Sequence, residues 1–480
     1  MNNSQRSTFA ILVSVFFFWG FVAASNDILI PVFKDAFGLQ NWQSQMINFA
    51  FYGAYFIGSL FYALLAGLAK FNIIEKFGFQ RSISIGLTVS ALGTLLFIPA
   101  ATFNSFLLMI TGLFVVGLGF SLQQTAANPF AISLGDPSKG SQRLSLAGGI
   151  NNLGTTVAPM LVSLAIFGSL KADSEVARSV SDVQTPYLLL GLAFILAATV
   201  FFITGKKEYR ELKLSKNKPS TIDDKTSTQV KEVSIFSYKQ LVLGMVAIFF
   251  YVGVEVATAG NLGEYMKREL GFTNNAIGPY VALFWGSLMI GRWANASAAF
   301  TSNNLLRITL KILLPFVAFG IFLGVTHLFG NDISPFYNYF FIIPILIIAD
   351  FASFEKPHFQ LAIFSILGIV SLLIGIYANG IYAVYGLMSV GLFCSTLWPC
   401  IFTLAISGLG KQASKGSSFL IMMILGGAVI SVLQGVLADV SFIGISNSFY
   451  LGVICFIYLF IYALIAGPIH TRNLADAKEM

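Results

Sequence analysis

Charged and reactive side chains are scarce in this chain of 480 residues. Charged residues make up 10% of the sequence, and there are three cysteines and three histidines. They lack the spacing of a metal site or a disulfide framework. These residues are Cys394, Cys400, Cys455, His327, His358 and His470. Because no nucleophile, base and metal constellation appears, we expect no enzyme, no catalytic residue, no metal site and no cofactor.

Apolar residues dominate the composition. Hydrophobic residues make up 56%, and a helix that spans a bilayer needs about 20 mostly apolar residues. The composition therefore predicts an all-α polytopic membrane protein. The net charge of +7 could suggest a nucleic-acid partner. If the N-terminus is cytoplasmic, however, 23 of the 28 Lys and Arg residues fall on the cytoplasmic side, so the charge follows the positive-inside rule and we expect no nucleic acid. The five outside are Lys34, Lys171, Arg178, Lys267 and Arg268.

Fourteen apolar segments can be placed along the chain. Residues 1–204 hold six of them, and residues 205–237 form a charged stretch that we interpret as a cytoplasmic linker. Residues 238–480 hold the other eight, because two extra stretches at about 306–350 lengthen the second half. We therefore expect two six-helix bundles, joined by the linker, and an extra hairpin in the second bundle.

A polar run, LGFSLQQTAANP, interrupts the fourth apolar segment at 118–129. Ser121, Gln124 and Asn128 are spaced i, i+3 and i+7 and share one stripe of a helix. Such side chains avoid lipid, so they either line a solute site or join helices by hydrogen bonds. Asn151 and Asn152 in the fifth segment pose the same choice among glycines that permit close helix packing.

Two carboxylates lie inside apolar segments, where they indicate an ion, proton or substrate site. Asp27 in the first segment shares a face with Trp19, and Glu255 in the seventh shares a face with Tyr251. The alternative for Glu255 is a structural hydrogen bond to a neighbouring helix. Arg292 comes near the end of the eighth segment, and we place it in the cytoplasm.

Several motifs resemble the fucose/galactose/glucose cation symporters of the major facilitator superfamily. The motifs are Trp19 with SNDILIP at 25–31, QTAANPF at 124–130, the Asn151 segment, and Trp285-Gly286 through Ile290-Gly291-Arg292. The resemblance implies a major facilitator fold with alternating access, and uptake of a monosaccharide with a cation. It also implies that Asp27 binds the proton and that Asn151 contacts the sugar. Gln124 departs from the fucose symporter, which has a carboxylate there, so sodium coupling stays open beside proton coupling.

These observations predict a secondary active importer of a hexose, a fucose-like sugar or a related monosaccharide. The predicted sugar-binding residues are Trp19, Asn26, Gln124, Asn128, Asn151, Asn152, Asn261, Trp285 and Trp398, and the predicted coupling residues are Asp27 and Glu255. We expect a monomer in the bacterial inner membrane with both termini cytoplasmic, and a sugar, a proton or sodium ion and lipid as its partners. An exporter of hydrophobic solutes and a sugar sensor that does not transport are the alternatives on the same fold.

Overall fold

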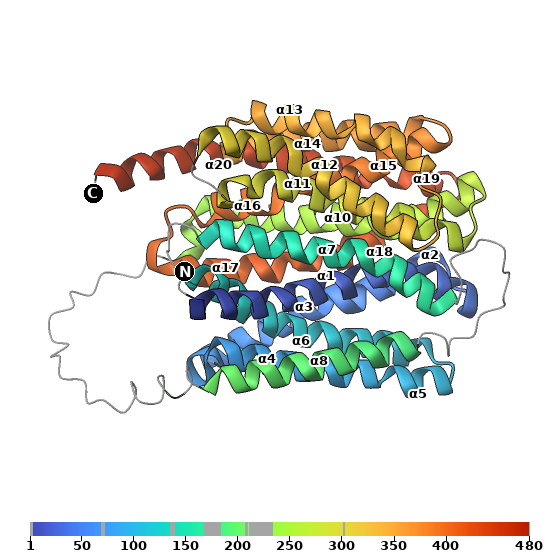
Figure 1. Cartoon of the computed structure of the whole chain (residues 1–480), viewed down its shortest axis with the longest axis horizontal. Helices are drawn as coiled ribbons and strands as arrows, with labels where there is room; N and C mark the ends of the chain where they lie inside the picture. Colours follow the sequence, from blue (N-terminus) through green and yellow to red (C-terminus); the bar gives the residue numbers. More distant parts are fainter. Residues whose placement is uncertain are drawn as a thin grey trace.

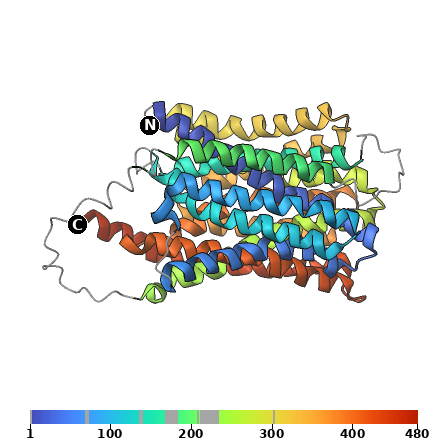
Figure 2. The same ribbon diagram turned by 90° about the horizontal axis from the view of Figure 1, so that it is seen from below.

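The computed structural model describes residues 3–68, 73–134, 140–167, 184–206, 210, 234–300 and 303–479. In these residues the regular structure is helical, and eleven helices are long and apolar enough to cross a membrane. Most of the predicted linker at 205–237 lies outside the described residues. The helices run roughly parallel to one long axis, and both chain termini lie at the same end of the bundle (Figures 1 and 2).

We name the helices before the linker the first half and those after it the second half. The first half comprises α1 (Asn3–Phe37), α2 (Asn41–Ser44), α3 (Met46–Leu68), α4 (Ile73–Leu95), α5 (Phe97–Thr102), α6 (Phe106–Ser133), α7 (Gly140–Phe167) and α8 (Gln184–Thr204). The second half begins with α10 (Lys239–Leu270), α11 (Asn274–Phe300), α12 (Asn304–Leu328), η4 (Ser334–Phe341), α13 (Ile343–Ala352) and α14 (Pro357–Tyr377). It continues with α15 (Ile381–Cys394), α16 (Leu397–Ile406), α17 (Ala413–Met422), η6 (Met423–Leu425), α18 (Gly426–Asp439), α19 (Gly444–Ser448) and α20 (Tyr450–Glu479).

Glycines bring α1 and α7 into close contact, and this contact positions part of the site. A Cβ atom at Gly20 would lie 1.9 Å from the carbonyl oxygen of Asn151, and one at Gly154 would lie 2.2 Å from that of Phe17. Only glycine allows the two backbones to approach this closely. The predicted role of Gly154 in helix packing is therefore confirmed, and Asn151 is held against the turn of α1 that carries Trp19.

The two halves meet along two seams, α7 against α11 and α3 against α18. In Figure 1 these helices, with α1 and α10, form the middle of the bundle, whereas α4 and α8 lie at one edge and α13 at the other. At the start of the first half's third segment, α4 begins at Ile73 and is kinked at Gly78, whose backbone is not helical. The φ of Gly78 is +81°, a conformation that side chains with a Cβ atom rarely adopt.

The predicted extra hairpin is present as α12, η4 and α13, and it packs mainly against α11. A buried ion pair fixes its two limbs together, with Lys311 Nζ 2.7 Å from Asp350 Oδ2. Gln360 Nε2 on α14 donates to Asp350 Oδ1 at 2.7 Å, and this hydrogen bond joins the hairpin to the rest of the second half. Lys311 is 5% exposed, and its ammonium group reaches a carboxylate within the bundle.

We expect Lys311→Met to destabilise the protein by about 3 kcal/mol or more, because it leaves Asp350 as an unpaired buried charge. The double variant Lys311→Met, Asp350→Leu should recover most of that loss, since it removes both charges together. The free energy of unfolding measured by SDS titration tests this. Arg307→Gln is the control, because it removes a basic residue of the same helix whose partner, Glu355, is exposed. Equal losses in the single and double variants would contradict the ion-pair account.

Candidate functional site

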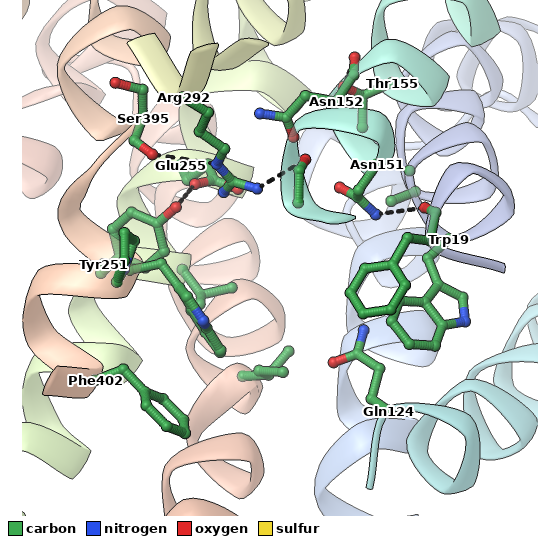
Figure 3. Close-up of a pocket in the computed structure, with 18 of the residues that line it drawn as sticks. Trp19, Gln124, Asn151, Asn152, Thr155, Tyr251, Glu255, Arg292, Ser395 and Phe402 are labelled. Carbon is green, nitrogen blue, oxygen red and sulfur yellow. Dashed lines mark hydrogen bonds between the residues drawn. The ribbon is translucent and has the colours of Figure 1, made fainter. Parts of the chain in front are cut away.

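A cavity of about 440 Å³ lies between the two halves (Figure 3). Its volume falls within the range of small-molecule sites. The first half contributes residues of α1, α3, α6 and α7, and the second half contributes residues of α10, α11 and the region of α15 and α16. A ligand bound in it would therefore contact both halves.

Most of the predicted site residues line this cavity. They are Trp19, Gln124, Asn128, Asn151, Asn152, Glu255, Trp285 and Trp398. Asn261 does not belong to the lining: it is 1% exposed, and its Nδ2 donates to the carbonyl oxygen of Ala257 one turn earlier in α10. Its amide is thus used within its own helix. The side chains of Asn26 and Asp27 lie outside the described part of α1.

The two neighbouring asparagines of α7 differ in their hydrogen bonds. Asn151 Nδ2 donates to the carbonyl oxygen of Phe16 at 2.8 Å, which joins α7 to α1. Asn152 is 2% exposed, and its Nδ2 has no hydrogen-bond partner among the residues that the structure describes. An unpaired buried amide costs about 1–3 kcal/mol, so the structure leaves at this point a donor that suits a ligand hydroxyl.

The polar run of α6 serves both purposes that the sequence left open. Gln123 joins helices, since its Oε1 accepts from Trp19 Nε1 at 2.8 Å and its Nε2 donates to Ser90 Oγ at 3.0 Å. Ser121 does the same with Ser59. Gln124 and Asn128 line the cavity, and Gln124 Nε2 donates to the hydroxyl of Tyr55 at 3.1 Å.

Aromatic rings form much of the remaining wall. The ring centre of Trp398 lies 6.1 Å from that of Tyr251. Phe402, one turn later in α16, has its ring centre 6.3 Å from that of Trp398. Trp19 and Trp285 are each 4% exposed and line the cavity. Apolar ring faces beside a few amide groups are typical of sites that bind a molecule with both hydroxyl groups and an apolar face.

Glu255 also lines the cavity, and Tyr251 one turn earlier donates a hydrogen bond to its carboxylate. The guanidinium of Arg292 lies close enough to interact with Glu255 electrostatically (Figure 3). The sequence placed Arg292 at the cytoplasmic end of its segment, whereas in the structure α11 continues for two further turns to Phe300 and Arg292 lines the cavity. Helical spacing was the available signal: Arg292 follows Trp285 by seven residues and shares its face.

Ion pairs and hydrogen bonds join the halves at the end of the bundle remote from both termini, which we call the distal end. Lys34 at the end of α1 pairs with Glu264 of α10, and Glu264 also pairs with Arg268. Asn41 Nδ2 of α2 donates to Asp439 Oδ1 of α18 at 2.5 Å. These contacts close the distal end of the seam between the halves.

Comparison with known proteins decides the family. The family model described as Major Facilitator Superfamily matches residues 7–354. The chain belongs to the Major Facilitator Superfamily. As a member it is a multi-pass membrane transporter and not an enzyme, and the helical fold of the described residues agrees with that assignment.

Relatives within the Major Facilitator Superfamily match almost the whole chain. The glucose/galactose transporter of Brucella abortus is 34% identical, over 95% of this chain and 93% of its own length. The L-fucose-proton symporter of Escherichia coli K12 is 27% identical, over 95% of this chain and 92% of its own. The crystal structure of the transporter FucP in the outward conformation matches with a TM-score of 0.62 and 26% identity, covering 97% of this chain and 99% of FucP.

Proposed function

We propose that this transporter imports a monosaccharide, a hexose or a fucose-like sugar, together with a proton. The observation that carries the proposal is the unpartnered amide of Asn152 in a cavity walled by tryptophans. A sugar supplies hydroxyl oxygens for such a donor and an apolar ring face for the tryptophans. The names of the relatives, glucose/galactose transporter and L-fucose-proton symporter, support the same substrate class.

Proton coupling is favoured over sodium coupling by the surroundings of Glu255. A sodium site is built from several oxygen ligands around the ion, and a neighbouring cation repels it. Glu255 has the guanidinium of Arg292 beside it, and its carboxylate accepts a hydrogen bond from Tyr251. Gln124 cannot titrate, so Glu255 in the second half and Asp27 on α1 are the carboxylates we assign to coupling.

Exchange of labelled sugar tests the substrate class. Proteoliposomes preloaded with one unlabelled sugar from a panel of monosaccharides should accumulate the labelled form transiently by counterflow, and the best substrate should do so at the lowest concentration. Counterflow of hydrophobic cations instead of sugars would favour the exporter. The five amides among the described lining residues, Gln124, Asn128, Asn151, Asn152 and Asn295, argue against an exporter of hydrophobic solutes.

We further propose that both termini are cytoplasmic, so that the distal end faces the exterior. The contacts of Lys34, Glu264 and Arg268 would then hold the exterior side closed, and they must separate when the sugar enters. Glu264→Gln leaves two cations without their shared carboxylate. We expect this variant to populate the outward-open state more strongly than the parent protein does.

Thiol labelling measures this shift. Asn48 of α3 is 1% exposed, and its Nδ2 donates to Gln45 Oε1 beneath the distal contacts. With the native cysteines replaced by serine, Asn48→Cys should react severalfold faster with a membrane-impermeant maleimide when Glu264→Gln is present. Glu269→Gln is the matched control, because Glu269 lies little more than one turn later in α10 but is exposed. Equal labelling rates in all three proteins would show that the distal ion pairs do not hold the halves together.

A further inference from the structure

Arg292 hydrogen-bonds to both halves of the transporter. Its Nε donates to the carbonyl oxygen of Ser395, between α15 and α16, at 3.1 Å. Its Nη1 donates to the carbonyl oxygen of Gly148 on α7 at 3.4 Å. A Cβ atom at position 148 would lie only 3.2 Å from Nη1, so a glycine leaves room for the guanidinium. The side chain therefore bridges the seam between α7 and α11 within the cavity (Figure 3).

Glu255 is the acid that shares this environment. Within the described residues, the charged and titratable side chains that interact with Glu255 are Arg292 on α11, Tyr251 on α10 and Cys394 on α15. Tyr251 and Cys394 are neutral in their ordinary protonation states at neutral pH. Arg292 is thus the positive charge that can compensate an ionised Glu255 inside the membrane, where an uncompensated charge is costly.

We propose that Arg292 is a positioning residue for proton coupling. Its charge sets how readily Glu255 releases its proton, and its hydrogen bond to Gly148 transmits the charge state of Glu255 to the first half. The inference rests on the proposed function, a proton-coupled sugar carrier. When Glu255 is ionised, its negative charge attracts the guanidinium, whose Nε and Nη1 donate to the two carbonyl oxygens. When Glu255 takes up a proton, this attraction is lost, so the contact across the seam changes with the proton.

The test is sugar counterflow and sugar affinity measured against pH. Both should fall as pH rises through the range in which the coupling carboxylate loses its proton. We call the pH range over which counterflow and affinity decrease the falling limb of the pH profile. In Arg292→Gln the ionised carboxylate loses its compensating charge, so the falling limb should move to higher pH by about one unit or more. Arg292→Lys keeps the charge and should keep the position of the limb. Arg307→Gln, an arginine replacement in the extra hairpin, serves as the control and should behave as the parent protein.

The double variant Glu255→Gln, Arg292→Gln separates coupling from a structural role. It removes both charges, and we expect the same pH dependence as in Glu255→Gln alone, with the protein still folded. A falling limb that stays in place in Arg292→Gln, or a shift that persists when Glu255 is already glutamine, would overturn the inference. Absence of sugar counterflow in the parent protein would instead refute the proposed function, so the two failures are distinguishable.

Discussion

Asn152→Leu is expected to lower sugar affinity at least about tenfold while leaving the stability of the protein unchanged or slightly raised. The reason is that leucine has nearly the same shape as asparagine, and that within the described part of the chain the Nδ2 of Asn152 makes no hydrogen bond that the substitution could break. The loss would therefore fall on the ligand alone. Binding of the best counterflow substrate and the free energy of unfolding by SDS titration, measured on the same preparations, check both parts.

Asn151→Leu is the matched comparison, since it lies one residue away on the same helix. Its amide donates to Phe16 across the contact between α1 and α7, so this variant should lose sugar affinity and also about 1 kcal/mol of stability. Unchanged affinity in both variants would remove the α7 asparagines from the sugar site. A loss of stability in Asn152→Leu as large as in Asn151→Leu would show that Asn152 serves the fold instead.

Glu255→Gln is expected to abolish accumulation of sugar against a gradient and to leave counterflow in place. A glutamine keeps the shape and can still hydrogen-bond to Tyr251, but it cannot take up or release a proton. Sugar exchange requires only that the sugar-loaded transporter alternates between its outward-open and inward-open states. Accumulation also requires the carboxylate to release its proton on the cytoplasmic side. Steady-state uptake driven by an imposed proton gradient, compared with counterflow in the same proteoliposomes, measures the difference.

Asp27→Asn provides the parallel variant for the carboxylate on α1. If Asp27 alone carries the coupling proton, this variant loses accumulation, and Glu255→Gln retains it. Loss in both variants would mean that the two acids act together. Accumulation at the parent level in both would contradict the assignment of coupling to either of them.

The sequence was sufficient to predict the class, the segments and much of the cavity lining, because those depend on local pattern. A bilayer accepts only helices whose backbone is satisfied, so apolar runs translate directly into spanning helices. Polar residues in such runs must face protein or solute, which is why Gln124, Asn151 and Glu255 were found. Local pattern could not say which amide pairs with protein. Gln123 and Gln124 are adjacent, yet one bonds to Trp19 and the other lines the cavity.

The partners of two basic residues could not be predicted, because they come from other helices. Lys311 and Arg292 look like the flanking charges of apolar runs, and the positive-inside rule assigns such charges to the cytoplasm. In the structure Lys311 forms an ion pair with Asp350, and Arg292 lines the cavity, where Glu255 is close enough to interact with it electrostatically. Asn261 was predicted to contact the sugar because it is an amide in a helix that lines the cavity. It does not line the cavity, and its Nδ2 donates instead to the carbonyl oxygen of Ala257. No spacing rule within one helix reveals Asp350 as the partner of Lys311 or Glu255 as the neighbour of Arg292.

Proton movement that accompanies sugar entry is the sharpest test of proton-coupled import. The purified transporter is reconstituted into proteoliposomes in weakly buffered medium without sodium, and the best counterflow substrate is added outside while the external pH is recorded. The account predicts that the medium becomes more alkaline as sugar enters, and that Glu255→Gln abolishes the pH change while counterflow continues. Entry of sugar with no pH change, or entry that requires sodium, would contradict proton-coupled import.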